Sequence, residues 1–229
     1  MTTYVLVPGA GGDAGYWRYV EPELRARGHD VVAVDLPGHD ENAGLNEYVD
    51  IAVAAVGDRR DLVVVGQSLG AFTASVLPTR VPVDLLVLVA GMVPAPGESA
   101  REWWGDTGAV EARRRSDEAL GRSADEPFDF LFSFFHDVDP ERTAELMAGP
   151  ERSEADRVFQ DPWPLDAWPD GPTRFLLCRD DRFFPAEFQR RVVKERLGIT
   201  PDEMPGGHLP AFSRPLDLVE RLEAYRLSA

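Results

Sequence analysis

Five short runs rich in valine and leucine recur along this sequence, and the segments between them are long enough to form helices. The runs occupy residues 4–7, 31–34, 62–65, 83–90 and 173–178. Nearly continuous apolar runs are typical of strands buried on both faces, and parallel neighbours require long crossover connections. The sequence therefore predicts an α/β fold with a mostly parallel central sheet flanked by helices. Residues 199–204 are a weaker candidate for a last strand.

One long region interrupts this alternation. From residue 92 to residue 165 there is no clear β run, and the region contains the aromatic stretch "PFDFLFSFFHDV" at 127–138. Four apolar side chains in this stretch follow helical spacing: Phe128, Leu131, Phe132 and Phe135. This spacing predicts a helix whose apolar stripe packs onto the core. We therefore predict a helical cap at 92–165, inserted between two strands of a core made of residues 1–91 and 166–229.

The composition is that of one acidic domain. A chain of 229 residues with 44% hydrophobic content can bury a single large core. The net charge of −16 repels nucleic-acid backbones and anionic membrane surfaces, so we expect neither of these partners. A small-molecule substrate is expected instead, and the sequence leaves open whether the chain is a monomer or a homodimer.

The chain has one cysteine, Cys178, which lies inside an apolar run. A buried thiol with no internal disulfide is therefore expected, which fits a cytoplasmic protein. Residues 2–9 match a first core strand and lack the basic region of a secretion signal. The four histidines and the cysteine show no metal-ligand spacing, so we expect no metal and no other cofactor.

A glycine-flanked serine follows the third predicted strand and precedes a helix-like run. Residues 66–70 read Gly-Gln-Ser-Leu-Gly, the G-x-S-x-G pattern of a nucleophile elbow. In such a turn the glycines allow strand and helix to approach closely, while the serine is held in unfavourable backbone angles above the sheet. The pattern and its context make Ser68 the candidate nucleophile.

With this motif, the chain resembles the α/β-hydrolase superfamily over nearly its whole length. The segments "VLVPGAGG", "VVAVDLPGH", "VVVGQSLG", "CRDDRFFP" and "GGHLP" occur in that family's order. The short length and the helical cap are most similar to small esterase-type members, including plant methylesterases, hydroxynitrile lyases and bacterial relatives. The resemblance implies an α/β-hydrolase fold and a catalytic triad of serine, histidine and an acid.

A serine hydroxyl needs an adjacent base, and the base needs an acid that orients it. His208 lies in a glycine-rich loop after the weak last strand, and it follows the serine and the acid in the family's order, so we predict that it is the base. The family pattern of an aspartate before Arg-Phe-Phe-Pro indicates Asp181 as the acid, with Asp180 as a turn residue. Asp137 remains an outside candidate for the acid.

An oxyanion hole needs two backbone N–H donors aimed at the developing negative charge. Leu69, directly after the candidate nucleophile, is expected to supply one donor. We predict that Ala10, in the turn after the first strand, supplies the other, with Gly11 as the near alternative. Pro8 stands where the family more often has histidine. Because proline has no backbone N–H to donate, we expect Pro8 to shape the turn.

Several residues outside this set are candidates for substrate contact. Gly11, Trp103, Trp104, Phe134 and Phe135 are predicted to line a pocket for an apolar or aromatic group. His136, together with its neighbour Asp137, either binds polar groups of the substrate or caps the end of a helix. By contrast, His29 and His39 are predicted to be structural, since they lie at a strand entry and in a turn.

The main functional hypothesis is a serine hydrolase of the esterase type that cleaves a small apolar or aromatic ester through an acyl-enzyme. Lactone and thioester hydrolysis pass through similar intermediates and stay open. A ligand-binding or receptor-like protein with little turnover, or a non-hydrolytic biosynthetic enzyme on the same fold, are the alternatives. A hydroxynitrile lyase is disfavoured because the one lysine, Lys194, lies in a predicted helix of the core rather than in the cap.

Overall fold

The computed structural model describes residues 1–123, 126–149 and 153–228. These residues form a six-stranded sheet in the order β2-β1-β3-β4-β5-β6, with parallel pairing between all neighbours. The strands are β1 (Thr3–Val7), β2 (Asp30–Ala33), β3 (Leu62–Gln67), β4 (Val83–Val89), β5 (Thr173–Cys178) and β6 (Asp202–Met204). The predicted α/β fold with a parallel sheet is confirmed, and the weak last strand is present as β6.

Helices connect the strands and cover the sheet. The α-helices of the described residues are α1 (Glu21–Ala26), α2 (Leu45–Val56), α3 (Gly70–Val76), α4 (Ala100–Asp106), α5 (Ala109–Ala119), α6 (Pro140–Met147), α7 (Asp156–Gln160), α8 (Ala186–Leu197), α9 (Pro210–Ser213) and α10 (Pro215–Ser228). Short 3₁₀ turns occur at η1 (Ala14–Trp17) and η2 (Leu77–Thr79), and a π-helical turn at η3 (Leu131–Phe135). None of the helices in this described part is long and apolar enough to cross a membrane.

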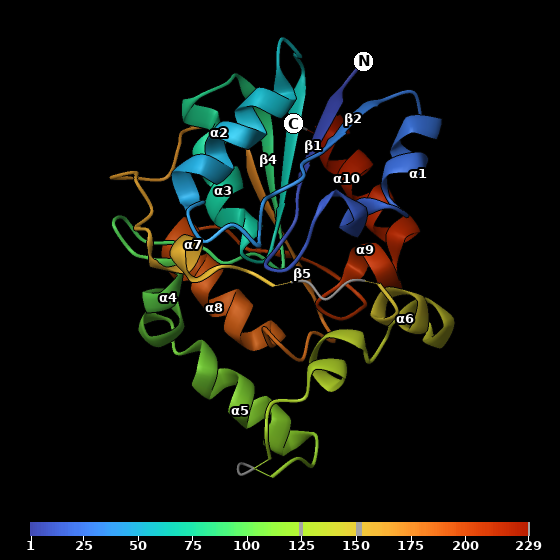
Figure 1. Cartoon of the computed structure of the whole chain (residues 1–229), viewed down its shortest axis with the longest axis vertical. Helices are drawn as coiled ribbons and strands as arrows, with labels where there is room; N and C mark the ends of the chain where they lie inside the picture. Colours follow the sequence, from blue (N-terminus) through green and yellow to red (C-terminus); the bar gives the residue numbers. More distant parts are fainter. Residues whose placement is uncertain (124–125, 150–152, 229) are drawn as a thin grey trace.

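The sheet separates two apolar cores. Alternate residues of each strand point to opposite faces, so Val5 of β1 packs with α2, α3 and α8, whereas Tyr4 and Leu6 pack with α1 and α10. Figure 1 shows α2 and α3 on the opposite side of the sheet from α1 and α10. Two covered faces explain why the strands are nearly continuous in apolar residues.

The strand order places a topological switch point between β1 and β3. From β1 the chain crosses to β2 on one side, and it then returns to β3 on the other side of β1. Loops that leave adjacent strands at such a point form a crevice at the carboxyl edge of the sheet, where ligands bind in open α/β folds. The glycine-rich turn after β1 and the Ser68 turn after β3 meet at this edge.

Helices α4 to α7 lie between β4 and β5, beyond the carboxyl ends of the strands (Figure 1, green to yellow). Two polar contacts, one buried and one partly buried, fix this segment to the core. The Arg196 guanidinium of α8 donates to the Glu98 carboxylate at 2.8 Å, and the Trp163 indole N–H donates to the Ser75 hydroxyl of α3 at 2.9 Å. The segment is therefore anchored to α3 and α8 and lies beyond the carboxyl edge of the sheet.

The predicted helix over the aromatic stretch is wrong in extent. The structure has only the π-helical turn η3 there, and Phe128 and Leu131 are each 50% exposed. Pro127 precedes the turn, and the Asp129 carboxylate accepts the Phe132 backbone N–H at 2.9 Å, which starts the turn after Phe128. The predicted apolar stripe therefore does not pack onto the core as a unit, although Phe135 is buried.

Candidate active site

Ser68 lies in a sharp turn between β3 and α3. Its φ angle is +51°, in the left-handed region that side chains rarely adopt. A Cβ on Gly66 would lie 2.6 Å from the Ala74 Cβ, and one on Gly70 would lie 2.3 Å from the Pro8 carbonyl oxygen. Both glycines are therefore required by close packing, and the strain of the turn is concentrated at Ser68.

A chain of hydrogen bonds joins Ser68 to two residues from distant loops. The His208 Nε2 atom lies 3.0 Å from Ser68 Oγ, and His208 Nδ1 lies 2.8 Å from Asp181 Oδ2. All three residues are buried, with exposed fractions of 8%, 1% and 4% for Ser68, His208 and Asp181. Because a carboxylate only accepts, Nδ1 donates to Asp181 and Nε2 is left to accept from the serine hydroxyl.

Asp181 is held rigidly at the end of β5. Its Oδ1 atom accepts the backbone N–H groups of Phe183 and Phe184 at 2.8 and 2.9 Å, and Gln189 of α8 approaches Oδ2 at 3.4 Å. The neighbouring Asp180 is exposed, and its carboxylate accepts the Gly206 N–H at 2.9 Å. The structure thus brings Asp181, and not Asp180, to the imidazole.

The candidate oxyanion donors belong to two turns that are in contact with each other. A Cβ on Gly9 would lie 2.9 Å from the Ser68 Cβ, so the turn after β1 is in close contact with the Ser68 turn. Within the described residues, no acceptor lies on the backbone N–H of Ala10 or of Leu69. The Gly11 N–H, in contrast, donates to Glu154 Oε2 at 2.8 Å. Ala10 and Leu69 therefore have the N–H groups that remain free to bind an oxyanion.

Three aromatic rings surround the His208 imidazole. The ring centroids of Phe134, Phe183 and Phe184 lie 5.4, 5.0 and 4.9 Å from that of His208. Trp104 packs against Phe183 with centroids 5.3 Å apart. Phe183 and Phe184 are not among the site residues predicted from the sequence, although their position shortly after the acid in "CRDDRFFP" is a signal that could have indicated them.

Other predicted pocket residues lie elsewhere. Trp103 is 1% exposed, packs in the core of α2, α3 and α8, and donates its indole N–H to the Val93 carbonyl at 3.0 Å. Phe135 is buried in the opposite core. His136 lies against the His208 loop, because a Cβ on Gly207 would be 2.7 Å from its Nε2 atom. Burial and the nearby Arg182 guanidinium lower the pKa of His136.

The remaining titratable candidates have structural surroundings. His29 Nε2 lies 3.0 Å from the Glu223 carboxylate, near the amino-terminal end of β2. The Cys178 thiol is buried, and burial raises its pKa well above the ordinary value. Lys194 Nζ donates to the Gly198 carbonyl at 3.1 Å, at the carboxyl end of α8. None of the described residues forms a cluster of three or more potential metal ligands.

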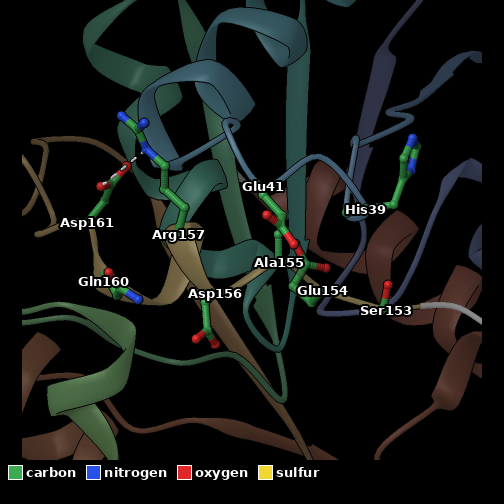
Figure 2. Close-up of a pocket in the computed structure, with 10 residues that line it drawn as sticks. His39, Glu41, Ser153, Glu154, Ala155, Asp156, Arg157, Gln160 and Asp161 are labelled. Atoms are coloured by element: carbon green, nitrogen blue, oxygen red, sulfur yellow. Dashed lines mark ion pairs between the residues drawn. The ribbon is translucent and has the colours of Figure 1, made fainter.

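A polar cavity of about 780 Å³ opens beside the turn after β1. Figure 2 shows that its lining side chains come from the loop with His39 and Glu41 and from residues 153–161. Glu154 lies in its wall, accepts from the Tyr48 hydroxyl, and connects the wall to Gly11. Burial raises the pKa of Glu154, while these two hydrogen bonds act in the opposite direction. Neither Ser68 nor His208 lines this cavity.

Comparisons with known proteins agree with this architecture. A model of the alpha/beta hydrolase family matches residues 4–222. Norfluorocurarine synthase 1 from a Strychnos species is 24% identical, covering 96% of this chain and 93% of that protein. Methylesterase 3 from Arabidopsis thaliana is 25% identical, covering 93% and 92%. The crystal structure of a pyrethroid hydrolase from Sphingobium faniae superimposes with a TM-score of 0.75 at 22% identity, covering 99% and 98%.

The family match covers most of the chain, and the chain therefore belongs to the alpha/beta hydrolase family. The predicted family and the predicted α/β-hydrolase fold are confirmed.

Proposed function

We propose that this member of the alpha/beta hydrolase family is a serine esterase that cleaves small apolar or aromatic esters through an acyl-enzyme. The observation that carries the proposal is the hydrogen-bond chain from Ser68 through His208 to Asp181, at 3.0 and 2.8 Å. A serine in a strained turn, bonded to a histidine that a buried carboxylate orients, has the geometry of an activated nucleophile. The name of Methylesterase 3 supports ester hydrolysis as the reaction class.

In the proposed mechanism, Ser68 Oγ attacks the ester carbonyl carbon and His208 Nε2 takes its proton. The negative charge on the carbonyl oxygen is bound by the Ala10 and Leu69 N–H groups. Collapse of the intermediate breaks the bond to the alkoxy oxygen, and the alcohol leaves with the proton from His208. Water, deprotonated by His208, then attacks the acyl-enzyme, and the carboxylic acid is released as Ser68 regains its proton.

The rings around His208 support an apolar or aromatic substrate. Phe134 and Phe183 are half-buried and in mutual contact, with centroids 4.5 Å apart, so they offer an apolar wall next to the position of the leaving group. Trp104 extends this wall, and the buried Trp103 packs against Trp104 with ring centroids 5.6 Å apart. We assign residues 92–165 as the cap that carries part of this wall, and residues 1–91 and 166–229 as the core.

The wider setting belongs to the same proposal. The net charge of −16 supports a small-molecule substrate rather than a nucleic acid or an anionic membrane. The lone, buried Cys178 supports a cytoplasmic location.

The proposal is tested by turnover of a panel of aryl and alkyl esters, lactones and thioesters. We expect the wild type to hydrolyse aryl esters best, and Ser68→Ala to lower kcat by at least about 10³-fold. The matched control is Ser116→Ala, which removes a hydroxyl from α5 and should leave kcat unchanged. A folded wild type that turns over no member of the panel, yet is stabilised against heat by its acid products, would instead be a binding protein.

One relative favours a second candidate, a non-hydrolytic biosynthetic reaction at the same residues, because its name is that of a synthase. In that case His208 acts as a base without a serine acyl-enzyme. Ser68→Ala would then retain most of the activity while His208→Ala would abolish it, whereas the esterase proposal predicts that both substitutions abolish it.

A further inference from the structure

The loop that carries His208 is held by a carboxylate from outside the core. Asp137 follows the η3 turn in the segment between β4 and β5, and its Oδ2 atom accepts the Gly207 backbone N–H at 2.7 Å. The flanking residues Phe135 and Val138 are buried in the core beside α1 and α10, which fixes the backbone on both sides of Asp137. Gly207 directly precedes His208, so this bond acts one residue from the imidazole.

Any side chain at position 207 would displace the side chains that form this contact. A Cβ on Gly207 would lie 2.6 Å from Asp137 Oδ1 and 2.7 Å from His136 Nε2. Real Cβ atoms essentially never approach other atoms to less than 3.0 Å, so a side chain at position 207 would force the Asp137 and His136 side chains to shift.

Three successive residues of the loop are fixed by three different elements. Asp180, after β5, accepts the Gly206 N–H at 2.9 Å, and Gln67, at the end of β3, donates to the His208 carbonyl at 3.0 Å. Gln67 belongs to the sheet, and Asp180 belongs to the loop that directly follows strand β5. Asp137 is the partner that comes from the segment between β4 and β5. A shift of that segment would therefore also shift the loop that carries His208.

We infer that Asp137 is a positioning residue that fixes His208 within reach of Ser68 by binding the Gly207 N–H. The inference rests on the proposed function and extends it, since Asp137 contacts neither the imidazole nor the serine. Asp181 occupies His208 Nδ1, so Asp137 is not the orienting acid that the sequence left open. Loss of the Gly207 bond would leave the loop free to move the imidazole away from the 3.0 Å contact with Ser68.

The test is the rate at which a fluorophosphonate inactivates the protein, followed by the mass of the Ser68 adduct. Saturation kinetics separate KI, which reports binding, from kinact, which requires His208 to activate Ser68. We expect Asp137→Ala to lower kinact by about 30- to 100-fold, the effect of an imidazole misplaced by about 1 Å, with KI changed by less than about twofold.

Two further variants separate positioning from general stability. Asp137→Asn keeps an oxygen that can accept the Gly207 N–H and should restore kinact to within about fivefold of the wild type. Asp139→Ala is the matched control two residues further on, where the carboxylate accepts the Glu141 N–H at 2.9 Å and only caps α6. It should lower the melting temperature while leaving kinact unchanged.

If Asp137→Ala does not fold, Gly207→Ala tests the same contact from the loop, and it should lower kinact with KI unchanged. Wild-type kinact in the tested variant, an equal loss in Asp139→Ala, or a loss confined to KI would each overturn the inference. A wild type that forms no Ser68 adduct would overturn the proposed function itself, a result distinct from all three.

Discussion

Gly70 offers the sharpest test of how the packing around Ser68 creates the site. A Cβ at this position would lie 2.3 Å from the Pro8 carbonyl oxygen and 2.8 Å from that of Val7. The optimal van der Waals separation of non-bonded heavy atoms is about 3.5 Å, so the turn after β1 and the Ser68 turn must separate by about 1 Å. Overpacking of this kind costs about 1–3 kcal/mol in the free energy of unfolding. For a chain of this size we expect Gly70→Ala to lower the melting temperature by roughly 3–10 °C.

The same displacement should impair catalysis, because the two proposed oxyanion donors lie on the two turns. Ala10 belongs to the turn after β1 and Leu69 to the Ser68 turn, so separating the turns moves one N–H away from the oxyanion. We expect kcat for an aryl ester to fall by about 10²-fold, with KM changed by less than about threefold. The assays are differential scanning calorimetry and steady-state hydrolysis on the same preparations.

Gly105 provides a matched control for this experiment. It lies in α4, and a Cβ there would meet no atom within 4 Å. Gly105→Ala should therefore be neutral or stabilise the protein by up to about 1 kcal/mol, with kcat unchanged. A Gly70→Ala variant that melts within about 2 °C of the wild type and keeps its kcat would refute the reasoning from close packing.

Three further predictions address the acid, the pH dependence and the aromatic wall. Asp181→Asn should lower kcat by about 10³- to 10⁴-fold with KM little changed, because an amide favours the wrong imidazole tautomer. A variant with the same steady-state kcat as the wild type would contradict this. Burial would raise the pKa of Glu223, but hydrogen bonds from Arg226, Tyr4 and His29 outweigh it and lower the pKa to about 2. The stability this carboxylate contributes is therefore present above its ordinary pKa of 4.5 and lost as the pH falls from 4.5 towards 2. Glu223→Gln should lower the free energy of unfolding, measured by urea denaturation, by about 1–2 kcal/mol at pH 7 and make it less dependent on pH below 4.5. If the free energy of unfolding had the same pH dependence in the wild type and the variant, this mechanism would be excluded. Phe134→Ala should raise KM for aryl esters by about 3- to 10-fold and leave KM for alkyl esters of the same acid nearly unchanged; a uniform rise for both would argue against an aromatic subsite.

The sheet was readable from the sequence because its strands are buried on both faces. Short continuous apolar runs such as "LVVV" and "FLLC" fit few structures other than buried strands when helix-length segments separate them. The Ser68 turn was equally readable, since its glycines and its place between strand and helix are local features. Asp181 and His208 depended on chain order and on the family resemblance, because their approach to Ser68 is a consequence of tertiary structure.

The region over the carboxyl edge of the sheet was predicted less well. Helical spacing in the aromatic stretch suggested a buried stripe, but Asp129 and Pro127 limit the helix to one turn and leave Phe128 exposed. Trp103 and Trp104 are adjacent in sequence, yet one lies in the core and the other against Phe183. The role of Asp137 depends on a contact with Gly207, 70 residues away, which sequence periodicity does not encode.

The most direct test of the account is intact-mass and peptide-mapping analysis after fluorophosphonate treatment of the wild type and of Ser68→Ala. We predict one adduct per wild-type chain, mapped to Ser68, and none in the folded variant. An unmodified, folded wild type, or an adduct that persists in Ser68→Ala, would contradict the claim that Ser68 is the activated nucleophile.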